Sequence, residues 1–136
     1  MKRIISLYTL TLLFSIAGYS QASCKKFKNG TFKITDPKSK QVCIITRKDN
    51  KQTEKMEESD DVYDFDITWL DDCTYTVTPT ASAVAKNQKI LDIGTMTVKI
   101  TKVKDSSYTQ RITVANNPKF RRVDEVFLVE TEKDYN

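Results

Sequence analysis

Apolar and polar residues alternate strictly in two neighbouring segments of the chain, residues 63–69 and 73–79. Successive side chains of a β-strand point to opposite faces, so this period of two predicts two strands, each with one apolar and one polar face. The inward row is expected to form the core rather than line a ligand cavity, because large aromatic side chains supply much of the buried area of a small domain. The residues of this row are Tyr63, Phe65, Ile67, Trp69, Tyr75 and Val77.

The same pattern predicts how these strands pair. Facing residues of a hairpin share one face of the sheet, so a three-residue loop that places Trp69 opposite Cys73 keeps the apolar rows together, whereas a two-residue turn would mix them. By the same reasoning, a loop at residues 105–107 places Ile100 opposite Ile112.

The rest of the chain also favours short strands. Asp49-Asn50 has the composition of a tight turn, and residues 79–90 are expected to be a loop or a helical turn. Seven or eight strands joined by tight turns predict an all-β, antiparallel meander that forms either a small lipocalin-like barrel or a sandwich. Further strands are expected at residues 27–35, 41–48, 51–57 and 123–131.

The first 22 residues have the three parts of a secretory signal peptide. Lys2 and Arg3 provide a positive start, residues 4–17 are mostly apolar, and the small residues Ser20 and Ala22 precede an expected cleavage site. The apolar run is shorter than the roughly 20 residues that cross a bilayer, so a cleaved signal is favoured over a membrane anchor. We therefore expect an exported protein, periplasmic or secreted.

A single β domain, residues 23–136, is expected to follow, with length for one modest core. Cleavage removes two basic residues and lowers the formal net charge from +4 to +2, which disfavours a nucleic-acid binder. The sequence contains no histidine, which excludes Ser-His and Cys-His nucleophiles and His-ligated metals. We expect a non-catalytic domain without a cofactor or metal.

Three cysteines in an exported chain permit one disulfide and leave one thiol. We expect Cys24 and Cys73 to pair because both lie near the ends of elements, while Cys43 lies within a strand, where a buried thiol acts as a small hydrophobe. The alternative disulfide joins Cys43 to Cys73. Cys24 also lies two residues past the expected cleavage site, so a lipoprotein lipidated on Cys24 is a competing interpretation, although Gln21 fits that pattern poorly.

Charged residues are concentrated in two places. Nine acidic residues lie between positions 54 and 72, but they lack the glycine and the final glutamate of an EF-hand calcium loop, so a solvated surface is expected. Lys119, Arg121 and Arg122 surround Phe120 and would suit an anionic polymer or a lipid headgroup. Because three charges are few, we expect an ordinary surface loop there.

Two motifs carry a family resemblance. The pattern CxxFxxGxF at residues 24–32 and the pattern WxxxCxY at residues 69–75 resemble a group of small exported proteins of Bacteroidota-type bacteria. The resemblance covers most of the mature domain. Some members of that group carry a DNA topoisomerase label, which a small, nearly neutral, exported domain does not support. Gly30-x-Phe32 on a first strand is also similar to lipocalin-like barrels, in which tryptophan usually takes the place of Phe32.

These observations favour a binding domain over an enzyme. In one version the barrel holds a small apolar ligand. In the other, loops hold a protein partner, as exported bacterial inhibitors of host lysozyme do, and the acidic segment 54–72 would suit a basic enzyme. The ligand version needs a cavity, whereas the partner version needs an exposed acidic or apolar patch on a well-packed molecule.

Overall fold

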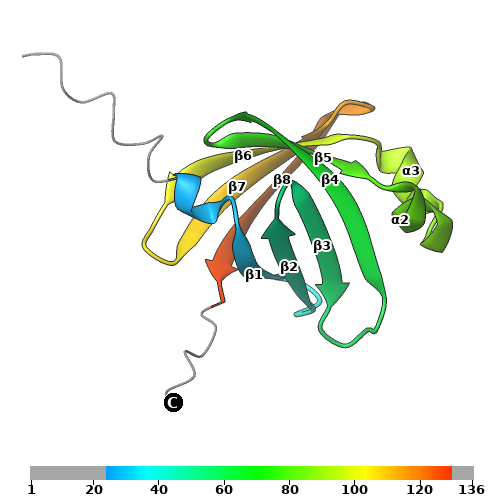
Figure 1. The fold of residues 1–136 in the computed structure, drawn as a ribbon, viewed down its shortest axis with the longest axis horizontal. Helices are drawn as coiled ribbons and strands as arrows, with labels where there is room; N and C mark the ends of the chain where they lie inside the picture. Colours follow the sequence, from blue (N-terminus) through cyan, green and yellow to red (C-terminus); the bar gives the residue numbers. More distant parts are fainter. Residues whose placement is uncertain (1–23, 130–136) are drawn as a thin grey trace, which may run out of the picture.

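Eight antiparallel strands form a closed barrel in the computed structural model, which describes residues 24–129 (Figure 1). The strands follow one another around the barrel in chain order, and the last pairs with the first, so the fold is a barrel and not a sandwich. The expected signal peptide lies outside the described residues. The strands are β1 (Gly30–Thr35), β2 (Val42–Lys48), β3 (Lys51–Met56), β4 (Val62–Asp71), β5 (Thr74–Pro79), β6 (Met96–Val103), β7 (Ser107–Val114) and β8 (Asn117–Leu128).

Three short helices complete the described chain: η1 (Lys25–Phe27), α2 (Ala81–Lys86) and α3 (Lys89–Ile93). The region expected to be a loop or a helical turn is therefore helical. The Thr80 hydroxyl caps α2 by accepting the Ala83 N–H at 3.2 Å. Among the described residues, no helix is long and apolar enough to cross a lipid bilayer.

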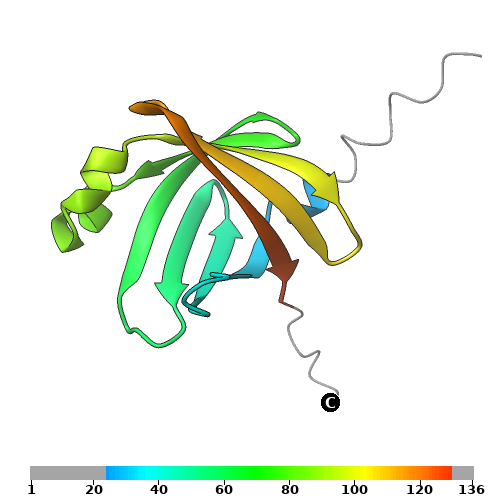
Figure 2. The same cartoon turned by 180° about the vertical axis from the view of Figure 1, so that it is seen from behind.

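The two ends of the barrel differ, as Figures 1 and 2 show from opposite sides. One end, called the η1 end below, carries η1 and the turns that join β2 to β3, β4 to β5 and β6 to β7. The other end, called the α-helix end, carries α2, α3 and the loops that join β1 to β2, β3 to β4 and β7 to β8. Phe27 of η1 closes the η1 end of the barrel, and its side chain is 0% exposed. We call this residue and η1 the plug.

A disulfide fastens this plug to the barrel. Cys24 and Cys73 are bonded with an S–S distance of 2.08 Å, which confirms the expected pair and leaves Cys43 as a free, half-buried thiol. The Lys28 ammonium donates to the Asp72 carboxylate at 2.9 Å beside the bridge. A sulfur bonded to Cys73 has no free valence for a lipid thioether, so this structure is incompatible with the lipoprotein interpretation of Cys24.

The expected registers of two hairpins are wrong by two residues. Trp69 lies opposite Tyr75 instead of Cys73, because Asp71 and Thr74 flank a two-residue turn and the register shifts between Trp69 and Asp71. The bulge adds one residue to β4, so a two-residue turn does not mix the two faces. A second bulge, between residues 100 and 102, shifts the hairpin of β6 and β7 in the same way.

Two positions depend on unusual backbone angles. Asp49 and Asn50 have φ values of 52° and 62°, which fit a two-residue hairpin turn with both central residues at positive φ and confirm the predicted turn. Gly30 opens β1 at φ 139°, where a Cβ atom would lie 3.2 Å from the Phe32 ring. A larger residue at position 30 is therefore strained in both its backbone and its packing.

The core has two clusters of buried residues. One lies around Phe27 and Phe32, and the other is built on β4, β5 and β6. Trp69 lies at the edge of this second cluster and not at its centre as predicted, because it is only partly buried, with its ring centroid 4.6 Å from that of Tyr75 and Lys28 above it. Tyr63 is also partly buried at this edge. The buried members of the predicted row are Phe65, Ile67, Tyr75 and Val77.

Candidate functional site

A charged side chain, Arg47 of β2, lies inside the barrel and is 2% exposed. Its guanidinium donates to the Phe27 carbonyl oxygen at 2.7 Å, to Gln52 Oε1 at 3.0 Å and to the Tyr108 hydroxyl. These partners come from η1, β3 and β7. Arg47 therefore joins the plug to both sides of the barrel.

Aromatic rings surround the same guanidinium. Its central carbon lies 4.4 Å from the ring centroid of Phe32 and 5.1 Å from that of Tyr75. Burial opposes the charge of Arg47, but the interactions with Tyr75, Tyr108 and Glu54 outweigh it and raise the pKa of the guanidinium. Arg47 is thus a fixed positive charge within the barrel.

A carboxyl group continues this network. Gln52 Nε2 donates to Glu54 Oε1 at 2.8 Å, so Gln52 links Glu54 to Arg47. Burial raises the pKa of Glu54, although Gln52, Arg47 and Arg122 favour its ionised form. Burial, with a contribution from Glu54, also raises the pKa of the Cys43 thiol to about 11, so Cys43 is a poor nucleophile at neutral pH.

The polar groups of this interior network are satisfied by one another. Within residues 24–129, every buried side-chain nitrogen and oxygen has a hydrogen-bond partner, so no buried polar group is left over for a ligand. The residues predicted as core or cavity lining pack against one another and against the aromatic rings around Arg47. The described part of the chain also contains no group of three or more Cys, Asp or Glu residues arranged to hold a metal ion.

The acidic segment 54–72 does not act as one surface. Glu54 belongs to the interior network, Asp66 pairs with Lys51, and Asp72 pairs with Lys28. The loop between β3 and β4 carries the remaining acidic cluster, the acidic loop, whose four carboxylates are exposed and form no ion pair with another described residue. These are Glu57, Glu58, Asp60 and Asp61.

The basic residues near Phe120 belong to β8 and not to the expected loop. Arg122 donates to the Asp124 carboxylate at 2.9 Å, and the Asp124 side chain is buried. Arg121, the next residue along the strand, instead lines a groove on the outer face of the barrel. The strand therefore divides this basic group between two faces.

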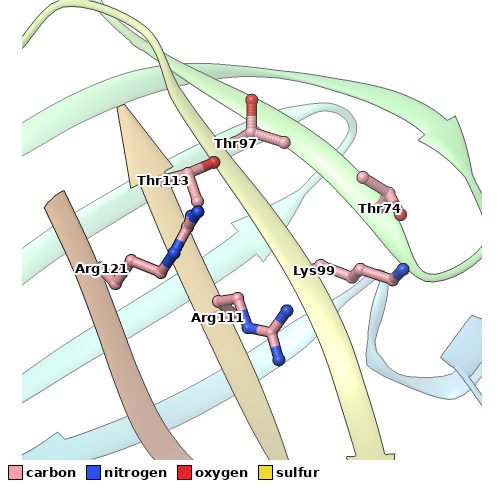
Figure 3. A pocket seen from close by; sticks show the side chains of 6 residues that line it. All are labelled: Thr74, Thr97, Lys99, Arg111, Thr113 and Arg121. Carbon is pink, nitrogen blue, oxygen red and sulfur yellow. The ribbon is translucent and has the colours of Figure 1, made fainter. Parts of the chain in front are cut away.

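The outer groove crosses β5, β6, β7 and β8, which lie side by side on the face seen in Figure 2. Figure 3 shows its six side chains gathered from these four strands. Three are cationic and three are threonines, and the hollow has a volume of about 540 Å³. Sequence reasoning missed this group because its members are spread over 48 residues of chain. The six are Thr74, Thr97, Lys99, Arg111, Thr113 and Arg121.

Comparison with known proteins adds no relative: no family model, no curated protein and no solved structure matches this chain.

Proposed function

We propose that this chain is a non-catalytic, exported binding domain that holds a basic protein partner, an enzyme of the lysozyme class, at its α-helix end. Two features of the interior support a surface-binding role: the polar groups around Arg47 are satisfied by one another, and the residues of the predicted inward row pack against one another. The observation that carries the proposal is the acidic loop, whose carboxylates are exposed and without ion pairs to other described residues.

The acidic loop suits a basic partner. Four carboxylates within five residues produce a local negative potential that attracts a positively charged surface and speeds association. The loop joins two barrel strands, and its Glu57 N–H donates to the Val42 carbonyl oxygen at 2.8 Å. One end of the loop is therefore held by β2, which limits the ordering that binding must produce.

Exposed apolar side chains at the same end add anchors. Met56 precedes the acidic loop, Leu91 and Ile93 lie on α3, and Phe120 lies near the start of β8, with exposed fractions of 37%, 62%, 46% and 39%. Binding energy at interfaces comes mainly from a few apolar or aromatic anchors, while charged residues contribute specificity and rate. The α-helix end offers both kinds of residue.

The test is calorimetric titration of a basic c-type lysozyme, at low and physiological salt, with an inhibition assay alongside. Asp60→Asn/Asp61→Asn is expected to weaken binding about tenfold, a loss of about 1.4 kcal/mol. The matched control is Asp49→Asn/Asp105→Asn, which removes the same charge at the η1 end. No binding by the unmodified protein, or equal weakening by both variants, would overturn the proposal.

A further inference from the structure

We infer that the outer groove of β5–β8 is a binding site for an acidic oligosaccharide, a short sugar chain that carries carboxylate or sulfate groups. The groove shares no lining residue with the acidic loop or the interior network, and this inference does not depend on the proposed function. It rests on three features of the lining residues: their charges, their hydroxyl groups and the rigidity of the strands that carry them.

The positive charges are placed against each other. Lys99 of β6 lies directly opposite Arg111 of β7, and Arg121 of β8 lines the same hollow. Like charges in facing positions destabilise a sheet. Within residues 24–129, none of these three side chains forms a salt bridge or a hydrogen bond with another side chain. A bound anion would remove this repulsion.

The Asp71 carboxylate interacts electrostatically with Lys99 but forms no salt bridge with it. Lys99 contributes a little to lowering the pKa of Asp71, but the main cause is the backbone N–H of Cys73, which donates to Asp71 Oδ1 at 2.8 Å. Asp71 is thus engaged in the turn between β4 and β5. The cations of the groove remain available to a ligand.

The remaining lining residues favour a sugar. Thr97 and Thr113 present hydroxyl groups that both donate and accept hydrogen bonds, as sugar hydroxyls require. The Thr74 hydroxyl donates to the Asp71 carboxylate and can still accept a hydrogen bond. Guanidinium groups bind carboxylate and sulfate oxygens in a planar, two-pronged arrangement. No aromatic residue lines the groove, so nucleic-acid bases would lack the stacking partners that single-strand binders provide.

Rigid strands hold these groups in place. Lys99 pairs with Thr74 on one side and with Arg111 on the other, and Thr97 pairs with Thr113. Arg121 lies at the register shift between β7 and β8. Four strands at about 4.8 Å spacing span about 14 Å. The backbone of paired strands is already ordered, so a ligand has to order only the lining side chains and not the chain that carries them. A short chain lying across the strands would meet Lys99, Arg111 and Arg121 together.

The experiment titrates the mature protein with three probes: a short oligogalacturonate, a heparin-derived oligosaccharide of similar length and a neutral malto-oligosaccharide. Binding is followed by calorimetry and by amide chemical shifts. The inference predicts binding of a carboxylated or sulfated probe, no binding of the neutral probe, and shifts confined to β5–β8. The two acidic probes distinguish carboxylate from sulfate as the recognised group.

Charge-matched variants separate a site from general attraction. Lys99→Gln/Arg111→Gln/Arg121→Gln is expected to lower affinity at least tenfold. The control, Lys33→Gln/Lys38→Gln/Lys40→Gln, removes the same charge elsewhere and is expected to change affinity less than twofold. Equal losses in both variants, equally tight binding of polyphosphate, or chemical shifts outside β5–β8 would overturn the inference. If the groove variant does not fold, the shifts of the unmodified protein decide alone. Asp60→Asn/Asp61→Asn is expected to leave sugar binding unchanged, so failure here and failure of the proposed function are distinguishable.

Discussion

The Arg47 guanidinium of β2 lies over the Phe32 ring of β1, with the guanidinium carbon 4.4 Å from the ring centroid and both side chains buried. The contact is diagonal, because the register places Arg47 opposite Gly30 and Phe32 opposite Ile45. A cation over an aromatic face is stabilised most where water is excluded. The contact places a permanent charge beside the plug of the barrel. It also connects the two aromatic motif positions of the η1 end, Phe27 and Phe32, through one side chain.

Arg47→Ala is expected to lower the free energy of unfolding by about 3–5 kcal/mol, because each buried acceptor left without a donor costs about 1–3 kcal/mol. The substitution leaves the Phe27 carbonyl, Gln52 and Tyr108 without their donor. Denaturant melts measure the change. Arg111→Ala, on the outer face, is the control and is expected to change stability by about 0.5 kcal/mol or less. Equal effects of the two substitutions would contradict a central role for Arg47.

Loss of the Cys24–Cys73 bridge is expected to cost about 4 kcal/mol, from the entropy of the 49-residue loop that it closes. A Cys24→Ser/Cys73→Ser double variant tests this value in chemical denaturation. Cys43→Ala serves as the comparison, with a smaller expected loss because its thiol is unbridged and half-buried. Non-reducing peptide mapping provides an independent check, and a peptide that links Cys43 to either partner would refute the assignment.

Two aromatic residues of β4 are expected to differ in their contributions to stability. Phe65 is 5% exposed in the second core cluster, so Phe65→Ala should cost about 3–5 kcal/mol. Trp69 packs on one side against Tyr75 and is otherwise partly open, so Trp69→Ala should cost less than Phe65→Ala. Thermal or denaturant melts of the two variants rank them. The opposite order would mean that Trp69 lies deeper than this packing indicates.

Glu54 is expected to make stability fall as pH rises above about 4.5. Burial raises its folded-state pKa above the ordinary value of 4.5, so its contribution is fully present below that value and is lost as pH rises through the raised pKa. The pKa values of Asp36 and Asp71 are lowered below 3.8, so the loss of stability on their protonation occurs at a lower pH than the effect of Glu54. Unfolding measured at several pH values should show this decline in the unmodified protein and not in Glu54→Gln. An identical pH dependence in both proteins would remove Glu54 as its cause.

The Cys43 thiol is expected to react slowly with thiol reagents at pH 8, because burial and Glu54 raise its pKa to about 11 and leave little thiolate. Modification by a disulfide reagent, followed by absorbance, should be much faster after unfolding in denaturant. Equal rates in native and unfolded protein would show that Cys43 is exposed.

Local alternation in the sequence determines where the best strands of this protein lie. Residues 63–69 and 73–79 alternate at a period of two, and the structure places β4 and β5 there. The turn at Asp49-Asn50 is equally local, since it depends on two residues that tolerate positive φ. Information within a few neighbouring residues is sufficient for such features.

Only the tertiary structure decides the strand register, and the register determines which outward side chains lie opposite one another in the groove. Alternation points Lys99 and Arg111 outward, but the expected loop at residues 105–107 would place Lys99 opposite Thr113. The bulge between residues 100 and 102 places Arg111 there instead. Bulges accommodate the twist and curvature of a sheet, and here that sheet closes over all eight strands, so two neighbouring strands alone do not reveal them.

The same reason applies to Arg47. Arg47 follows Cys43 and Ile45 at a spacing of two residues, which points its side chain into the barrel. A charged residue in a strand is nevertheless expected to face solvent until its partners are known. Those partners lie on η1, β3 and β7, up to 61 residues away in the chain. Burying a charge is favourable only when such groups satisfy it, and closure of the barrel is what brings them together.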